Sequence, residues 1–322
     1  MYKYIIYGSS FGFYDVSYYD IIIQKNVKYY KYIEPNNQIL KYLYRFCFST
    51  KVNRIIKIPF KNIWIKALDP RLYNDGEGYC FLFFSRWLEK DFVRSYLDYL
   101  LKRYPKAKYV CFFHDLISTH LLDINYVKQM FDLVLSYDKN DSETYGLLYY
   151  PTPYSSINIK EDPNYFSDVY FLGKAKNRLH EILNVYDQLE AKGLRCRFFI
   201  TGLSKDISLN KKGIKIIESM TYKENLIYVR NSKCLLEIMQ HGAVGITPRT
   251  WEAIMYNKHL ITNNSFLKGT NYYNQSSVTI LGEQLLSNIS ADNIISANFS
   301  EETRQALSPV NLLSFISNHS CN

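Results

Sequence analysis

Two apolar runs separated by one amphipathic segment constrain the fold of this chain more than any other feature. The runs are Tyr79–Phe84 and Lys108–Phe113, and nearly continuous apolar residues are typical of strands that are covered on both faces. Between them, Glu89–Arg103 carries its apolar residues on one side, as an α-helix does, and Pro105 follows its end. A strand, a helix and a strand in this order favour a parallel sheet with a right-handed crossover.

The same alternation of strands and helices starts again in the second half of the chain. Asp168–Leu172 is a predicted strand, and Asn177–Lys192 is a predicted helix with Asn177 as its N-cap. Thr221 and Glu224 have the spacing of a capping box and predict the start of a further helix. Each half of the chain is therefore predicted to build its own sheet.

Length and turn residues divide the chain between the two series of elements. A chain of 322 residues is long for one core and indicates two domains of about 150 residues each. Prolines at 151, 153 and 163 lie between the series, where neither a helix nor a central strand continues. We predict an α/β fold class with two Rossmann-like, doubly wound domains, 1–155 and 156–300. Residues 301–322 form a predicted helical tail that packs back on the first domain.

Composition excludes several classes of protein. The six cysteines include no C-x-x-C pair, which favours reduced, buried thiols and a cytoplasmic protein. There is no run of about 18 apolar residues that predicts a membrane-spanning helix. Lys3–Tyr7 is predicted to be the first strand, and the glycines after it, Gly8 and Gly12, lack the G-x-G-x-x-G spacing of a dinucleotide-binding oxidoreductase.

Positive charge is concentrated in one segment near the N-terminus. The chain has a net charge of +9, and residues 25–66 contain one acid, Glu34, and ten basic residues. The ten are Lys25, Lys28, Lys31, Lys41, Arg45, Lys51, Arg54, Lys57, Lys61 and Lys66. Basic residues interleaved with Tyr, Phe and Trp suit an anionic membrane surface or a phosphate-bearing acceptor. Nucleic acid, or a solvated basic face with tyrosines packed inward, are the alternatives.

Residues 233–264 combine a strand, a glycine-bearing loop, a short helix and a second strand. The predicted strand Cys234–Ile238 leads into a loop with Gly242, Gly245 and Arg249, and Glu252 lies in the first turn of the predicted helix Thr250–Asn257. Ligands of open α/β sheets bind outside the carboxyl ends of the strands. Backbone N–H groups and Arg249 can face a diphosphate, and a carboxylate such as Glu252 can accept both ribose hydroxyls.

Four stretches of the second half resemble bacterial glycosyltransferases of the GT-B fold that build lipopolysaccharide, capsule or exopolysaccharide. Asp168–Arg178 reads DVYFLGKAKNR, and Leu235–Ile238 reads LLEI. They are followed by GITPRTWEA at 245–253 and KHLITNN at 258–264. The resemblance covers about residues 165–265 and implies two Rossmann-like domains that face each other across a cleft.

The resemblance implies a nucleotide-sugar donor site in the second domain. The residues implied are Gly173, Lys174, Arg178, Tyr222, Thr247, Arg249, Thr250 and Glu252. Glycine would let the backbone approach the diphosphate, the basic residues would offset its charge, and Tyr222 would flank the base. Ordinary structural roles are the alternatives: Gly173 in a turn, Lys174 and Arg178 on a solvated turn, and Glu252 against the helix dipole.

The chemistry of transfer is predicted to need neither a metal nor a cofactor. No Asp-x-Asp triplet is present, and the position eight before Glu252 is Val244 rather than a second Glu, which favours an inverting displacement. Asp115 or His114, directly after a buried strand, is the predicted catalytic base, with Asp15 as a further candidate. A His beside an Asp is also common as a structural pair. Ser10 and Gly12 are predicted to border the acceptor.

These observations predict a glycosyltransferase that passes a sugar from a nucleotide donor to a saccharide in bacterial surface-polysaccharide synthesis. Uridine diphosphate is the expected donor nucleotide because it is prevalent. The expected partners are a lipid-linked or oligosaccharide acceptor and an anionic membrane surface, without nucleic acid. The expected location is the cytoplasm, with peripheral attachment to the inner face of the cell membrane. A non-catalytic nucleotide- or polyanion-binding α/β protein is the alternative.

Overall fold

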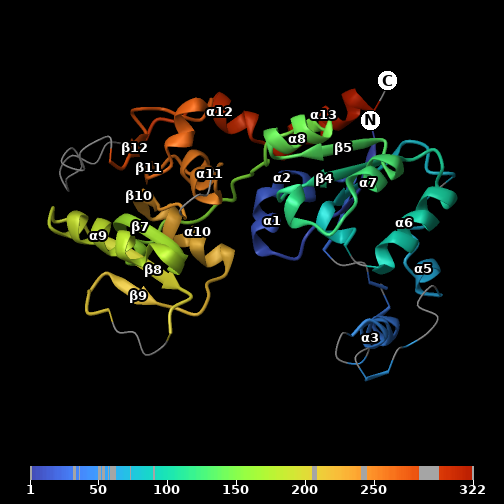
Figure 1. Ribbon diagram of the computed structural model, residues 1–322, viewed down its shortest axis with the longest axis horizontal. Coiled ribbons are helices and arrows are strands. Elements are labelled where there is room, and N and C mark those ends of the chain that lie inside the picture. Colours follow the sequence, from blue (N-terminus) through green and yellow to red (C-terminus); the bar gives the residue numbers. More distant parts are fainter. Residues whose placement is uncertain are drawn as a thin grey trace. The chain divides into compact units, whose positions relative to one another are not determined.

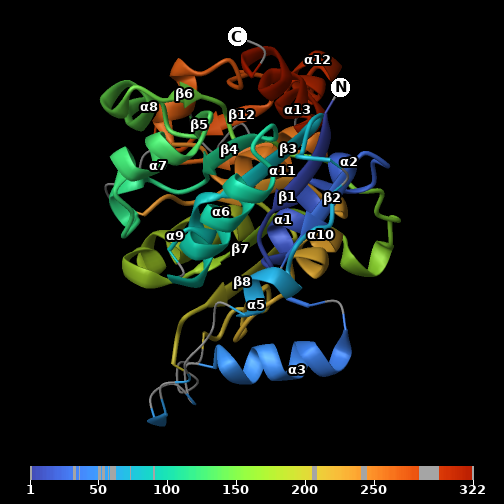
Figure 2. The ribbon, with the colours of Figure 1, turned by 90° about the vertical axis from the view of Figure 1, so that its right-hand side faces the viewer.

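The computed structural model divides into two compact units (Figures 1 and 2). Unit 1 consists of Met1–Pro153 and Ser308–Asn322, and unit 2 of Tyr154–Leu307. The structure describes residues 2–31, 34–35, 37–49, 52, 55–56, 58, 63–72, 74–89, 91–204, 209–240, 245–282 and 297–320. The residues singled out in the sequence that lie outside this part are Lys51, Arg54, Lys57, Lys61, Gly242, Val244 and Cys321.

The described residues of unit 1 form a six-stranded sheet in the order β2-β1-β3-β4-β5-β6. Every neighbouring pair is parallel. The strands are β1 (Lys3–Tyr7), β2 (Val27–Tyr30), β3 (Tyr79–Phe84), β4 (Lys108–Phe113), β5 (Leu133–Ser136) and β6 (Leu148–Tyr149). The strand order reverses between β1 and β3, and a crevice is expected at the carboxyl ends of these two strands.

Helices precede and follow these strands along the chain. They are α1 (Gly12–Ser17), α2 (Tyr19–Ile22), α3 (Gln38–Cys47), α5 (Ile63–Ala67), α6 (Asp91–Arg103), α7 (Ile124–Met130), α8 (Lys139–Tyr145) and α13 (Pro309–His319). Two short 3₁₀ helices, η1 (Ser85–Trp87) and η2 (Ile117–Thr119), directly follow β3 and β4.

The described residues of unit 2 form a second six-stranded parallel sheet, in the order β12-β11-β10-β7-β8-β9. The strands are β7 (Ser167–Lys174), β8 (Cys196–Thr201), β9 (Ile214–Ile216), β10 (Ser232–Glu237), β11 (His259–Thr262) and β12 (Val278–Ile280). Read from β9, this is the Rossmann strand order, with the reversal between β7 and β10.

The helices of unit 2 include one whose start the sequence misplaces. They are α9 (Leu179–Glu190), α10 (Tyr222–Arg230), α11 (Pro248–Met255) and α12 (Glu301–Ala306), with the 3₁₀ helices η3 (Pro163–Tyr165), η4 (Lys176–Arg178) and η5 (Ser265–Gly269). The predicted N-cap Asn177 is wrong, because the chain turns at Lys176 (φ 42°) and α9 starts after Arg178. The capping box is confirmed, since Thr221 and Glu224 each bond the backbone N–H of the other.

The end of the chain packs into the core of unit 1. Leu312, Leu313 and Ile316 of α13 belong to the same buried cluster as β1, β3 and β4. The Tyr4 hydroxyl of β1 donates to the Leu313 carbonyl at 2.8 Å and lies 2.8 Å from the Ser317 hydroxyl. The segment predicted as one tail is divided between the units, because α12 lies in unit 2.

The predicted α/β fold class with two doubly wound parallel sheets is confirmed. Cys80, Cys111, Cys196 and Cys234 are buried free thiols in strands. Among the described residues, no helix is both long and apolar enough to cross a membrane.

The packing of α13 predicts different costs for two apolar truncations on one helix. Leu312→Ala removes a fully buried side chain and should lower the free energy of unfolding of unit 1 by about 2–5 kcal/mol. Val310→Ala, on the exposed side of α13, should change it by less than about 0.5 kcal/mol. Urea titration followed by circular dichroism measures both. Equal effects would show that α13 does not belong to this core.

Candidate functional site

A cavity of about 360 Å³ lies at the strand-order reversal of unit 2. Its walls come from the carboxyl ends of β7 and β10, from α10 and from the start of α11. The lining includes five of the eight predicted donor-binding residues, namely Arg178, Tyr222, Thr247, Arg249 and Glu252. Gly173, Lys174 and Thr250 are not among the lining residues.

The carboxylate of Glu252 has three side-chain partners in this cavity. Its Oε1 accepts hydrogen bonds from the Tyr222 hydroxyl at 2.8 Å and from the Asn225 amide at 2.9 Å. Its Oε2 pairs with the Arg249 guanidinium. Glu252 is 1% exposed, and burial raises the pKa of its carboxyl, while Arg249 and the two hydrogen bonds oppose that rise. Tyr222 thus points its hydroxyl at Glu252 rather than presenting it to a ligand.

Arg249 connects α11 to β7. Besides Glu252, its guanidinium donates to the Leu172 carbonyl at 3.2 Å and lies 5.3 Å from the centre of the Tyr170 ring. Burial would lower the pKa of Arg249, yet the neighbouring Glu252 carboxylate more than offsets it and the pKa is raised. The guanidinium therefore stays charged, and its planar shape is fixed against a ring and a carboxylate.

A second buried carboxylate, Glu237, ends β10 in the same cavity. It accepts hydrogen bonds from three threonine hydroxyls: Thr247, Thr250 at 3.1 Å and Thr262 at 2.5 Å. Glu237 is buried rather than a surface carboxylate at a strand end. Thr247 and Thr250 therefore hold the end of β10 against α11, which accounts for both residues without a ligand.

Arg178 is bonded differently from Arg249. Its guanidinium donates to the carbonyls of Ile238 and, at 3.1 Å, of Lys174, and so bridges the ends of β10 and β7. Burial lowers its pKa. A Cβ on Gly173 would lie 2.7 Å from the Phe171 ring and 3.2 Å from the Arg178 guanidinium. Glycine at 173 thus leaves the space that Arg178 occupies, while Lys174 is exposed outside the cavity.

The start of α11 offers fewer N–H donors than the sequence indicates. Pro248 has no N–H, the Arg249 N–H bonds the Thr247 hydroxyl at 3.1 Å, and the Thr250 N–H bonds the Thr247 carbonyl. Met239, at the end of β10, donates its N–H to Asn263. Side chains of the described residues, rather than this helix end, therefore supply the positive charge at the cavity.

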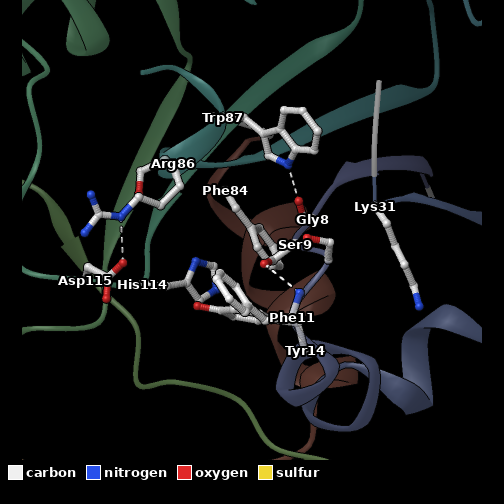
Figure 3. Close-up of a pocket in the computed structure, with 12 residues that line it drawn as sticks. Gly8, Ser9, Phe11, Tyr14, Lys31, Phe84, Arg86, Trp87, His114 and Asp115 are labelled. Carbon is white, nitrogen blue, oxygen red and sulfur yellow. Dashed lines mark hydrogen bonds and ion pairs between the residues drawn. The ribbon is translucent and has the colours of Figure 1, made fainter. Parts of the chain in front are cut away.

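Unit 1 has a cavity of about 400 Å³ at its own strand-order reversal (Figure 3). Residues at or after the carboxyl ends of β1, β2, β3 and β4 line it: Gly8, Ser9, Ser10, Phe11, Tyr14, Lys31, Phe84, Ser85, Arg86, Trp87, His114 and Asp115. Trp87 donates its indole N–H to the Gly8 carbonyl and so ties the ends of β3 and β1 together. Phe11 is exposed, and the predicted acceptor residue Ser10 lines the cavity, whereas Gly12 begins α1 outside it.

His114 is held in a neutral state by its surroundings. Its Nδ1 lies 3.1 Å from the Phe112 carbonyl and can only donate there, which leaves Nε2 to accept from the Tyr18 hydroxyl. The ring contacts those of Phe84 and Phe112, and the ring centroids are 4.1 Å apart in each pair. Burial lowers the pKa of His114 to about 3. An imidazole with its lone pair already used and so low a pKa is a poor general base.

The two aspartates differ in position. Asp115 lines the cavity, is half-exposed, and accepts from Arg86 Nε at 2.9 Å through Oδ2 (Figure 3). Asp15 is outside the lining and pairs with Lys31 at 2.6 Å. Of the three predicted bases, Asp115 therefore has the position that best suits a general base, because its carboxylate lies at the cavity wall after a buried strand.

Several residues of the two sites were not among those predicted from the sequence. Arg86 and Trp87 follow the carboxyl end of β3, the same signal that singles out His114 and Asp115 after β4. Asn225 lies three residues after Tyr222, on the same face of α10, and this spacing was the available signal. Among the described residues, no group of three or more His, Cys, Asp or Glu side chains could hold a metal ion.

Several solved structures resemble this chain over nearly its whole length, including two with TM-scores above 0.5. One is an α-glucosyltransferase in complex with UDP and a 13-mer DNA containing an HMU base, with TM-score 0.60, 10% identity and 99% of each chain covered. The other is a UDP-N-acetylglucosamine 2-epimerase candidate from Listeria monocytogenes, with TM-score 0.53, 11% identity, and 99% of this chain and 97% of that chain covered.

These likenesses, with two Rossmann-like units in tandem, define a GT-B-like fold. At such identities they establish the architecture alone. No protein-family model and no curated protein sequence matches the chain.

The burial of His114 predicts that its ring stays neutral in the folded protein from pH 8 to pH 5. Its folded pKa of about 3 lies below the ordinary value of about 6.5, so the unfolded chain binds a proton that the folded chain does not. The contribution of His114 to the free energy of unfolding is therefore complete above about pH 6.5 and is lost as the pH falls toward about 3. NMR of the ring nitrogens checks this, with a urea-denatured sample as control. A folded-state midpoint near that of the denatured sample would contradict it.

Proposed function

We propose that this chain is a glycosyltransferase that moves a sugar from a nucleotide-sugar donor to a saccharide acceptor. In this proposal the donor binds in the unit 2 cavity and the acceptor in the unit 1 cavity. The observation that carries it is the buried Arg249–Glu252 pair beside Arg178, at the strand-order reversal of a Rossmann-like sheet. Such crevices bind nucleotides in other proteins of this architecture.

Each cavity residue has a role that its contacts support. Arg178 bonds carbonyls rather than a carboxylate, and we assign it the donor diphosphate, where its charge would stabilise the leaving group. Glu252 would accept a ribose hydroxyl at Oε2, with Arg249 holding that carboxylate in place. Gly173, Lys174, Tyr222, Thr247 and Thr250 keep the donor site in shape or border its mouth.

The reaction we propose is a single displacement. Asp115 takes the proton of an acceptor hydroxyl, the acceptor oxygen bonds to the anomeric carbon, and the bond from that carbon to the diphosphate breaks. One displacement inverts the anomeric configuration, in line with the absence of a glutamate eight positions before Glu252. The proposed reaction needs no metal ion, because cationic side chains stabilise the departing diphosphate.

The proposed acceptor is a lipid-linked or oligosaccharide intermediate of bacterial surface polysaccharide, such as lipopolysaccharide or capsule. The resemblance at residues 165–265 supports this choice, and so does the exposed ring of Phe11 at the unit 1 cavity. The chain would then act at the cytoplasmic face of the membrane.

A saccharide 2-epimerase or a non-catalytic binder would share the donor site. Product analysis separates the three, because only a transferase yields a new glycosidic bond, only an epimerase yields an epimerised sugar, and a binder yields no product.

The donor assignment predicts a specific loss of nucleotide affinity. Arg178→Gln should weaken UDP binding about 10- to 100-fold, because a charge-assisted contact to the diphosphate is lost. Arg197→Gln is the matched control, since that guanidinium also bonds a carbonyl but lies outside the cavity. Isothermal titration with UDP measures both variants.

The choice of UDP is checked first by the shift in melting temperature that UDP, GDP, ADP, NAD and an oligonucleotide each cause. The oligonucleotide is included because one structural neighbour was solved with DNA. Stabilisation by NAD or the oligonucleotide alone, or equal UDP affinity in the Arg178 and Arg197 variants, would refute the donor assignment.

The base assignment predicts a loss in kcat without a loss of donor binding. Asp115→Asn should lower kcat about 100- to 10,000-fold, as expected when a general base is removed. Glu89→Gln is the control, because Glu89 is the other carboxylate on Arg86, at 2.9 Å, and does not line the cavity. Release of nucleoside diphosphate from the preferred nucleotide sugar is measured. If kcat falls equally in both variants, Asp115 only positions Arg86 and is not the base.

A further inference from the structure

Helix α3 (Gln38–Cys47) carries an exposed apolar face that nothing in the donor or acceptor sites explains. Four side chains at helical spacing make up this face, which we name the α3 stripe: Ile39, Tyr42, Leu43 and Phe46. Their exposed fractions are 72%, 72%, 51% and 58%. Positions i, i+3, i+4 and i+7 lie on one side of an α-helix, and an amphipathic helix normally buries such a stripe.

The helix itself is well formed and attached through its other side. Asn37 caps it by accepting the Ile39 and Leu40 N–H groups at 2.9 and 3.2 Å. Tyr44 contacts the rings of Trp64 and Phe92, with centroids 5.6 and 6.0 Å apart. At 100° per residue, Tyr44 lies roughly opposite the centre of the stripe. The stripe therefore points away from the rings that hold α3 in unit 1, and both ribbon views show α3 apart from the sheet (Figures 1 and 2).

The surroundings of the stripe are positively charged. Glu34, the one acid among residues 25–66, is bonded by both Lys41 and Arg45 at 3.4 and 2.9 Å. Lys28 in β2 and Lys66 in α5, which precede and follow α3 along the chain, are exposed. Three further isoleucines of the same region, Ile55, Ile56 and Ile63, are also exposed. Apolar side chains next to basic ones suit the surface of a lipid bilayer, which has an apolar interior and anionic headgroups.

We propose that the α3 stripe inserts into the interface of an anionic lipid bilayer and attaches unit 1 to it. A helix of ten residues is about 15 Å long, half the hydrocarbon thickness, so it lies in the interface plane instead of crossing the membrane. Tyr42 suits the headgroup level, and Phe46 suits the apolar face of an interfacial helix. This inference rests on α3 and its charges, and not on the proposed reaction.

The charge of the segment argues against the other occupants. A second copy of this chain would bring an equally basic segment against the first, and like charges facing each other are unfavourable. Nucleic acid would match the charge, but the centre of the stripe holds Ile39 and Leu43, which offer no ring on which bases stack. An anionic bilayer matches both the charge and the aliphatic centre.

The test is co-sedimentation of the full chain with vesicles of phosphatidylcholine, with and without phosphatidylglycerol. Leu43→Asp/Phe46→Asp should lower the partition coefficient on anionic vesicles about 100-fold or more, because two apolar anchors are lost. Leu121→Asp/Phe266→Asp is the matched control, since it makes the same replacements at exposed sites elsewhere. The control changes the net charge equally and should shift binding less than about threefold.

Four outcomes would overturn the proposal. They are no binding of the unaltered chain to anionic vesicles, equal loss in both variants, preference for an oligonucleotide over vesicles, or a dimer that the stripe variant dissociates. Leu43→Ser/Phe46→Ser repeats the test without new charge, and circular dichroism checks that each variant is folded. UDP affinity is measured on the same samples. A chain that binds UDP but not vesicles would overturn this inference alone, and one that binds vesicles but not UDP would overturn the donor site alone.

Discussion

The buried ion pair of Arg249 and Glu252 is the interaction on which the unit 2 site depends. It joins the start of α11 to the end of β7, through the Leu172 carbonyl, and to α10, through Tyr222 and Asn225. Removing either member would leave an uncompensated buried charge, at a cost of about 3–5 kcal/mol. The same bonds limit what Glu252 can offer a ligand, because both oxygens already have protein partners. Arg178 is therefore the more direct candidate for an anion.

The two units share one topological feature, a reversal of strand order, but different side chains line the cavity beside it. In each sheet the strand order reverses once, and the residues that follow the flanking strands line a cavity. In unit 2 that cavity holds two arginines and two carboxylates. In unit 1 it holds Phe84, Trp87 and a neutral His114, with Asp115 and Arg86 at its wall. A charged crevice suits a nucleotide diphosphate, and a more apolar one suits the face of a sugar. The proposed function therefore assigns the donor to unit 2 and the acceptor to unit 1.

Sequence pattern was a good guide to the elements and a weaker one to the side chains. The apolar runs of β3 and β4 and the capping box at Thr221 depend on neighbours within a few residues, and the structure confirms them. His114 depends on Tyr18, which is distant in the sequence, and its role as a base could not be judged from periodicity. The hydrogen bonds of Glu237 to three threonines could not be predicted from the sequence either, because these partners lie 10 to 25 residues away and meet only in the folded protein.

A crystal structure of the chain soaked with a nucleotide sugar tests the proposed donor site most directly. We expect the diphosphate to lie within hydrogen-bond distance of Arg178 at the ends of β7 and β10, with the ribose toward Glu252. A nucleotide bound in unit 1, or anywhere remote from Arg178, Lys174 and Arg249, would refute this site.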